Sequence, residues 1–111
     1  MSEVEWIEDK DRLTAVLLSN PQVVIDFTAP SWCVPCQRFA PHYEKAAESA
    51  SLQSNIVGLT KFVAVDVDKC PWAMLDYGVQ GVPTVVLYRQ GEYVKHLQER
   101  TVIKLLNEIQ P

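Results

Sequence analysis

The residues that decide the fold are Gln22-Val-Val-Ile-Asp-Phe-Thr28, a continuous run in which β-branched and aromatic side chains dominate. Such a run is typical of a strand buried on both faces in the middle of a parallel sheet. A short turn follows, and then comes Trp32-Cys33-Val34-Pro35-Cys36. Beyond it, apolar residues recur at spacings of three and four, which predicts a long helix over 34–52 that bends or breaks at Pro41. The two cysteines are therefore expected where the central strand ends and the long helix begins.

The remainder of the chain alternates between strands and helices. Runs of β-branched residues predict strands over 4–7, 61–67, 83–89 and 93–97, the last two joined by a tight turn at 90–92. Helical spacing predicts helices over 9–19, from Cys70-Pro71 to Gly78, and from about Glu99 onward. Elements in this order predict an α/β fold in a single domain spanning 1–111. We expect a mixed, mostly parallel sheet with one antiparallel C-terminal hairpin and helices on both faces.

Composition and charge exclude several classes of protein. The 111 residues carry a formal charge of -4, the wrong sign for binding a phosphate backbone, so we expect no nucleic-acid partner. The apolar stretches are far shorter than the roughly 18 residues that a membrane helix needs. Residues 1–9 hold four acids and no basic cluster, unlike the start of an export signal. We therefore expect a cytoplasmic monomer with no membrane partner.

Two of the three cysteines form a Cys-x-x-Cys pair, which in a cytoplasmic chain indicates redox chemistry or metal binding. A thiol at a helix N-terminus meets unpaired N–H groups and the positive end of the helix dipole, and both favour the thiolate. Cys33 is therefore the expected nucleophile. Cys36 lies one helical turn deeper, near enough to bridge Cys33, as a resolving thiol would.

Cys70, His42 and His96 lie outside this pair. Three cysteines and one histidine would suffice for zinc, but their spacing matches no standard zinc motif, so we expect no metal. Both histidines are expected to face solvent. Cys70 has only Lys69 as a basic neighbour in sequence, so a passive thiol is favoured over the alternative, a regulatory or intermolecular disulfide.

Taken together and in order, these motifs resemble the thioredoxin family. They comprise the strand with Asp26, then Ala-Pro-x-Trp-Cys-x-Pro-Cys, Pro41 five residues beyond Cys36, Asp66-Val-Asp68, Tyr77-Gly-Val-x-Gly-Val-Pro83-Thr, and Gly91. The resemblance covers about residues 20–95. It implies the thioredoxin fold and a dithiol active site at Cys33 and Cys36.

The resemblance also implies roles for residues around the sulfurs. Asp26 matches the family's buried acid, which acts through water as a base for the resolving cysteine. The residue pattern indicates the same role, since a carboxyl in a buried apolar strand is desolvated and desolvation favours its protonated form. Pro83 matches the family's cis-proline, which would leave the backbone of Val82 free to pair with an extended substrate segment. The expected substrate surface consists of Trp32, Val34, Pro35, Gly81 and Val82, together with Pro83.

The chain departs from the family pattern at several positions. Val34 stands where the commonest motif has glycine, so the usual potential of about −270 mV cannot be carried over. One extra residue separates Asp26 from Cys33, and we expect the turn at Pro30-Ser31 to absorb it. Ala64 replaces the lysine that many thioredoxins place across from the acid. The family's glycine after the last strand has no clear counterpart over 97–101.

We therefore predict a protein-disulfide oxidoreductase that reduces protein disulfides through Cys33 and Cys36 and needs no bound cofactor. The resemblance implies that electrons come from NADPH through thioredoxin reductase, and that targets include ribonucleotide reductase or peroxidases. These roles belong to electron transport and cell redox homeostasis. Two alternatives stay open. One is a more oxidising disulfide isomerase or oxidase, which Pro35 disfavours, and the other is a non-catalytic binding module with this fold.

Overall fold

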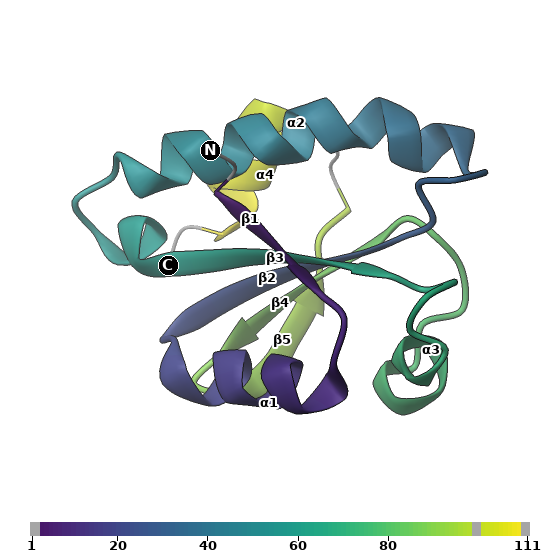
Figure 1. Ribbon diagram of the computed structural model, residues 1–111. Coiled ribbons are helices and arrows are strands. Elements are labelled where there is room, and N and C mark those ends of the chain that lie inside the picture. Colours follow the sequence, from purple (N-terminus) through teal and green to yellow (C-terminus); the bar gives the residue numbers. More distant parts are fainter. Residues whose placement is uncertain (1–2, 99–100, 110–111) are drawn as a thin grey trace.

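Strand β2 (Gln22–Thr28) lies in the middle of a five-stranded sheet whose order is β1-β3-β2-β4-β5 (Figure 1). The computed structural model describes residues 3–98 and 101–109. Glu99, the expected start of the last helix, lies outside these residues. The other elements of the chain are β1 (Val4–Ile7), α1 (Lys10–Ser19), α2 (Val34–Ser51), the 3-10 helix η1 (Ile56–Leu59), β3 (Thr60–Asp66), α3 (Trp72–Tyr77), β4 (Thr84–Arg89), β5 (Glu92–His96) and α4 (Val102–Ile109). Apart from η1, which has no counterpart in the sequence-based prediction, the elements confirm the predicted order of strands and helices.

The sheet is mixed, and its antiparallel part is larger than one hairpin at the edge. β1 and β2 both run parallel to β3, whereas β4 runs antiparallel to β2 and β5 antiparallel to β4. The expectation that antiparallel pairing is confined to the C-terminal hairpin is therefore wrong. The length of α3 explains the difference, because its six residues extend only about 9 Å. Such a helix does not by itself carry the chain back along a strand of about 23 Å. β4 starts at the end of the sheet where β3 stops, because Thr84 and Val65 pair with the same residue, Phe27.

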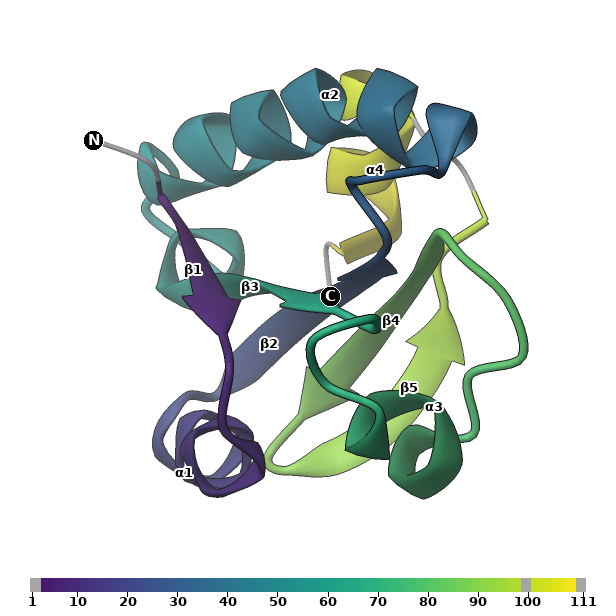
Figure 2. The same cartoon turned by 45° about the vertical axis from the view of Figure 1, so that its right-hand side comes forward.

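Helices cover both faces of the sheet (Figure 2). α1 and α3 lie against one face, and α2 and α4 lie against the other. The continuous apolar run of β2 serves both layers, since Val23, Ile25 and Phe27 join one core cluster while Val24 joins the other. Asp26 faces the α2 side, where it lines a cavity together with residues of that helix. In the described part of the chain, no helix is long and apolar enough to cross a membrane.

Local signals fix the ends of the helices. Asp9 caps α1 by accepting a hydrogen bond from the N–H of Asp11 at 2.8 Å. Gly78 ends α3 in the left-handed region, with φ of 65°, which glycine adopts without the steric cost that a Cβ would bring. α2 continues through Pro41, so of the two outcomes expected at this residue, the break does not occur.

Gln22 is a buried polar residue that ties α4 to the sheet. Its side chain has no exposed surface, and its amide group donates to the hydroxyl of Thr60 at 2.8 Å and to the carbonyl of Ile109 at 3.2 Å. The guanidinium of Arg89 donates to its oxygen at 2.6 Å. Residues far apart in the chain therefore meet at the start of β2, which holds the end of α4 against the sheet.

Glu5 connects the short edge strand β1 to its neighbours. Arg12 of α1 donates two hydrogen bonds to the Glu5 carboxylate at 2.8 and 2.9 Å, and Lys61 Nζ of β3 lies 3.1 Å from the same group. These cations, chiefly Arg12 through its hydrogen bond, lower the pKa of Glu5 to about 2. The ion pairs help to hold a strand of only four residues in the sheet.

Candidate active site

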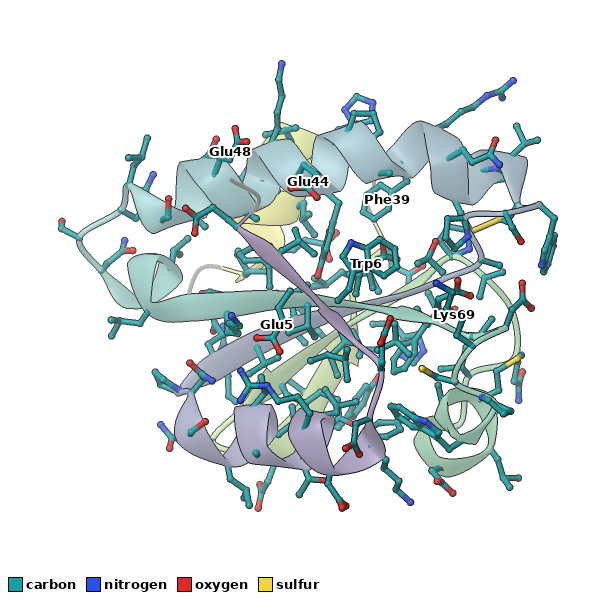
Figure 3. All side chains as sticks on the ribbon, in the orientation of Figure 1. Glu5, Trp6, Phe39, Glu44, Glu48 and Lys69 are labelled. Atoms are coloured by element: carbon teal, nitrogen blue, oxygen red, sulfur yellow. A yellow bond between two sulfur atoms is a disulfide. The ribbon has the colours of Figure 1, made fainter. Side chains whose placement is uncertain are left out.

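Cys33 and Cys36 are joined by a disulfide at the start of α2, visible as a yellow bond in Figure 3. Their Cα atoms lie 5.2 Å apart. Cys33 is the N-cap of the helix, and its sulfur accepts a hydrogen bond from the N–H of Cys36 at 3.2 Å. The N–H groups of Trp32 and Cys33 both donate to the carbonyl of Ala29, which closes the turn after β2. The sulfur of Cys33 therefore lies among the N–H groups of the helix start, where negative charge on sulfur is stabilised.

The loop before β4 lies against this disulfide. The carbonyl oxygen of Val82 is 3.8 Å from Cys33 Sγ, and the peptide bond between Val82 and Pro83 is cis. Within the loop, the hydroxyl of Thr84 donates to the carbonyl of Gly81 at 2.6 Å. Cys33 keeps 4% of its surface exposed and Cys36 keeps 2%. The difference in exposure between the two cysteines is therefore smaller than the sequence suggests.

Apolar side chains next to the cysteines are exposed. Trp32 keeps 61% of its surface and Val34 keeps 50%, and Gly81 is exposed while Val82 is half-buried. Pro35 is exposed as well, but it lines a shallow hollow on the outer side of α2, together with Arg38. Pro83, also expected at this surface, is buried. The other residues of the expected substrate surface are available to a partner, with Pro35 at its margin.

Trp32 is held by a residue that the sequence does not identify as part of the site. Its indole Nε1 donates to the carboxylate of Asp68 at 2.7 Å, across 36 positions of the chain. The N–H of Asp68 in turn donates to the carboxylate of Asp66 at 3.0 Å, which shapes the turn after β3. The only sequence signal for this contact is that Asp66-Val-Asp68 belongs to the motifs of the resemblance. Asp68 therefore orients the indole on the exposed surface beside Cys33.

Asp26 lies close to the resolving cysteine, on the α2 side of the sheet. It keeps 4% of its surface exposed, and Ala64 is its partner on β3, as the expected replacement of the family's lysine requires. Asp26 and Cys36 both line a cavity of about 260 Å³. Pro30 and Ser31, where the sequence places the extra residue before Cys33, lie in a turn. The cavity provides space for water between the carboxyl and the sulfur.

Tyr43 of α2 lies next to Asp26 and is completely enclosed. Its hydroxyl oxygen is 2.7 Å from the carbonyl of Val63 and 3.1 Å from that of Val24. Burial, together with the charge of Asp26, raises the pKa of Tyr43 well above its usual range. Tyr43 therefore stays a neutral phenol that anchors α2 to the sheet, and it is not expected to act as a base.

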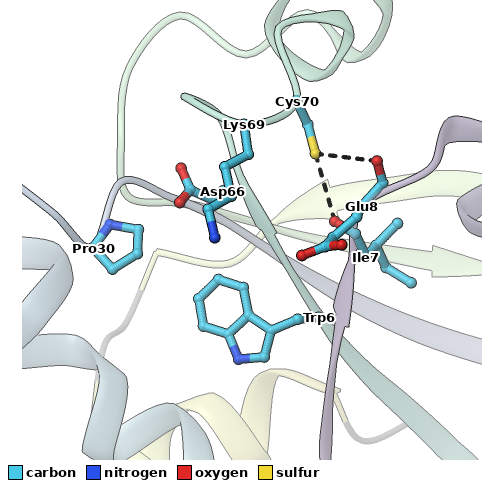
Figure 4. Close-up of a pocket in the computed structure, with 7 residues that line it drawn as sticks. All are labelled: Trp6, Ile7, Glu8, Pro30, Asp66, Lys69 and Cys70. Atoms are coloured by element: carbon cyan, nitrogen blue, oxygen red, sulfur yellow. Dashed lines mark hydrogen bonds between the residues drawn. The ribbon is translucent and has the colours of Figure 1, made fainter.

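Cys70 lies apart from the disulfide, at a separate hollow of about 230 Å³ (Figure 4). It is buried and free, and its thiol donates to the carbonyl oxygens of Ile7 and Glu8 at 3.6 and 3.7 Å. Burial is the main reason why the pKa of Cys70 is raised, and the charge of Asp66 adds to it. These contacts favour a passive thiol, because the thiolate form is disfavoured.

The residues weighed for zinc do not come together. Among the residues that the structure describes, no group of three histidine, cysteine, aspartate or glutamate side chains could hold a metal ion. His42 and His96 are both exposed, and His96 Nδ1 lies 2.6 Å from the hydroxyl of Tyr93.

Comparisons with known proteins agree with this site. The family model Thioredoxin matches residues 4–110. The "Thioredoxin" of Haemophilus influenzae is 34% identical over 85% of this chain and 81% of that protein, and "Thioredoxin-1" of Schizosaccharomyces pombe is 29% identical over 92% and 91%. "Thioredoxin M4, chloroplastic" of Arabidopsis thaliana is 33% identical over 81% of this chain, which spans only 43% of its length. The solved structure of a mutant thioredoxin from Halobacterium salinarum superposes with a TM-score of 0.79, at 31% identity, over 96% of this chain and 87% of that one.

Proposed function

The chain belongs to the thioredoxin family and is a thiol-disulfide oxidoreductase, and we propose that it acts as a dithiol reductant of protein disulfides. The observation that carries this proposal is the disulfide between Cys33 and Cys36 at the start of α2, with Cys33 as the helix N-cap. A binding module would need neither the second sulfur nor a buried acid beside it.

The first step is attack by Cys33. In the reduced protein the Cys33 thiolate, stabilised at the helix start by the N–H of Cys36, attacks one sulfur of a disulfide in the target. A bond forms between that sulfur and Cys33 Sγ, the disulfide bond of the target breaks, and the second sulfur of the target leaves as a thiolate. The product is a mixed disulfide between the two proteins.

The second step is resolution by Cys36. Its thiol loses a proton, which Asp26 accepts through water in the cavity that both residues line. The Cys36 thiolate attacks Cys33 Sγ, the Cys33–Cys36 disulfide forms, and the remaining sulfur of the target leaves as a thiolate. Two electrons have then passed from the dithiol to the target.

The target is proposed to bind as an extended segment over the disulfide. The backbone of Val82 next to Cys33 Sγ would pair with this segment, and the exposed indole of Trp32 would contact its apolar side chains. Val34, Pro35 and Gly81 complete the proposed contact surface, and Pro83 holds the end of the loop.

The cellular setting extends the same proposal. We propose that NADPH supplies the electrons through thioredoxin reductase, that the protein itself binds no cofactor, and that it works as a monomer in cytoplasmic redox homeostasis and electron transport. Disulfide-containing targets such as ribonucleotide reductase or peroxidases fit this role. Membership in the thioredoxin family supports these partners.

Trapping of the mixed disulfide tests the function. Cys36→Ser should stop catalytic reduction of insulin and accumulate a covalent adduct through Cys33, which mass spectrometry detects. Cys33→Ser should form no adduct, and Cys70→Ser, the matched control, should turn over like the unchanged protein. A Cys36→Ser variant that binds targets without any covalent adduct would support a binding module instead.

The equilibrium potential separates a reductant from an oxidant. Titration against a glutathione buffer, followed by tryptophan fluorescence next to the disulfide, should give a value near or below about −250 mV. A value near about −180 mV or higher would support an isomerase or oxidase.

A further inference from the structure

The cavity beside Asp26 and Cys36 is larger than water transfer between them requires. Its volume of about 260 Å³ compares with about 30 Å³ for one water in the liquid. It lies between the sheet and α2, and Trp6 and Glu44 belong to its wall (Figure 3). The cavity is therefore roomy enough for a small organic molecule.

A row of three side chains across the sheet explains why the space exists. Trp6 of β1 pairs with Ala64 of β3, and Ala64 pairs with Asp26 of β2. Paired residues on neighbouring strands lie on the same face of a sheet. Because the middle member of the row is only a methyl group, the buried carboxyl and the indole are separated by open space. Trp6, which is half exposed, lies at the outer end of this row.

The wall of the cavity has the chemistry of a cation site. Two carboxylates line it, Asp26 from the sheet and Glu44 from α2, and no lysine, arginine or histidine is among the lining residues that the structure describes. Thr28 adds a buried hydroxyl, and the ring of Trp6 offers a face of the kind that attracts cations. The charges of both carboxylates also contribute to raising the pKa of Tyr43, which lines the same cavity. This effect indicates a negative electrostatic potential there. Apolar residues form most of the remaining wall.

We propose that this cavity binds a free primary alkylammonium ion with a short alkyl chain. The ammonium group donates its hydrogen bonds to Asp26, Thr28 or Glu44, and the alkyl chain contacts Ala64 and the indole of Trp6. A cation of this size offsets the cost of holding a carboxylate away from water. The site shares Asp26 and the water space with the proposed resolution step, but binding to the oxidised protein does not depend on turnover.

Lys69 is a cation of the chain itself that lies near this site. It lines the hollow next to Cys70, which shares Trp6 and Pro30 with the cavity (Figure 4). Its side chain is exposed, and it lines the hollow but not the cavity. The Lys69→Met variant therefore tests whether this side chain competes for the site.

The experiment is a titration of the oxidised, ¹⁵N-labelled protein with butylammonium chloride, observed through the indole N–H of Trp6 and the amide N–H of Ala64. Saturable shifts of both signals are expected. Butanol, which has a similar shape and no charge, and sodium chloride at equal ionic strength are the controls and should not reproduce them. Equal shifts with butanol would overturn the proposal, because the site would then be merely apolar.

Matched variants separate the cavity from the general surface charge. Glu44→Gln should weaken binding about three- to fivefold, whereas Glu48→Gln, one turn further along α2 and exposed, should leave it unchanged. Ala64→Leu, which fills the space, should abolish the shifts, and its folding is checked by circular dichroism. If Ala64→Leu does not fold, the comparison of Glu44→Gln with Glu48→Gln tests the proposal in its place. Equal effects of both glutamate variants, or binding seen only in Lys69→Met, would overturn the proposal.

Discussion

Gln22 offers a direct test of how the last helix is held to the sheet. Its fully buried side chain takes part in three hydrogen bonds, one of them donated by the guanidinium of Arg89. The bond from Arg89 contributes about 1.5–3 kcal/mol and each of the two neutral bonds about 1 kcal/mol. A buried leucine in its place returns about 1.5 kcal/mol. We therefore predict that Gln22→Leu lowers the free energy of unfolding by about 2–3.5 kcal/mol.

Urea unfolding of the oxidised protein, followed by tryptophan fluorescence, measures this change. Gln53→Leu is the control, because Gln53 is exposed and its substitution should change the free energy by less than about 0.5 kcal/mol. Combining Gln22→Leu with Arg89→Met should cost less than the sum of the two single effects, since both remove the same bond. The reasoning is refuted if Gln22→Leu is no more destabilising than Gln53→Leu at an unchanged urea dependence.

Glu5, Cys70 and Trp32 each make a contact whose loss has a measurable effect. Glu5→Gln should lower the free energy of unfolding at neutral pH by about 1 kcal/mol. The pKa of Glu5 is about 2 in the folded protein instead of 4.5. The stability difference between Glu5→Gln and the unchanged protein should therefore shrink as the pH falls from 4.5 toward 2. Urea titrations that show the same stability difference at every pH would contradict this prediction. Burial raises the pKa of Cys70, so in the reduced, folded protein iodoacetamide should modify it at least about tenfold more slowly than Cys33; equal rates by mass spectrometry would disprove the protection. Asp68→Ala removes the hydrogen-bond acceptor of the Trp32 indole and should lower kcat/KM for a protein disulfide about two- to tenfold, whereas an unchanged value would show that this bond does not position the indole.

Features that depend on neighbouring residues could be predicted from the sequence. The apolar run of β2 needs no knowledge of the remaining chain to indicate a strand buried on both faces, and the structure confirms it at the centre of the sheet. The Cys33–Cys36 pair is equally local, because the spacing of three residues brings the sulfurs together wherever a helix begins. The end of α3 is also local, because the left-handed conformation that ends this helix is adopted by Gly78 itself.

Contacts between distant residues could not be predicted in this way. The direction of β4 depends on how far α3 carries the chain, and a strand pattern does not record direction. Gln22 is a polar residue at the start of an apolar strand. Its burial is explained only by its hydrogen bonds to Arg89 and to the carbonyl of Ile109 at the end of α4. Asp68 accepts a hydrogen bond from Trp32, which is 36 positions away in the chain. The spacing of residues in the sequence does not predict contacts over such a separation.

The spacing of the active-site cysteines also decides how much the disulfide restricts the unfolded chain. Cys33 and Cys36 are three positions apart, so the crosslink closes a ring of very few residues. Closing such a ring removes conformational entropy worth only about 2 kcal/mol, compared with about 4.7 kcal/mol for a loop of about 100 residues. Opening and closing this bond therefore changes the balance between folded and unfolded chains less than a crosslink between distant residues would. A bond from α2 to a distant strand would have coupled each change of oxidation state more strongly to folding stability, whereas the observed one restricts only a single turn of the chain.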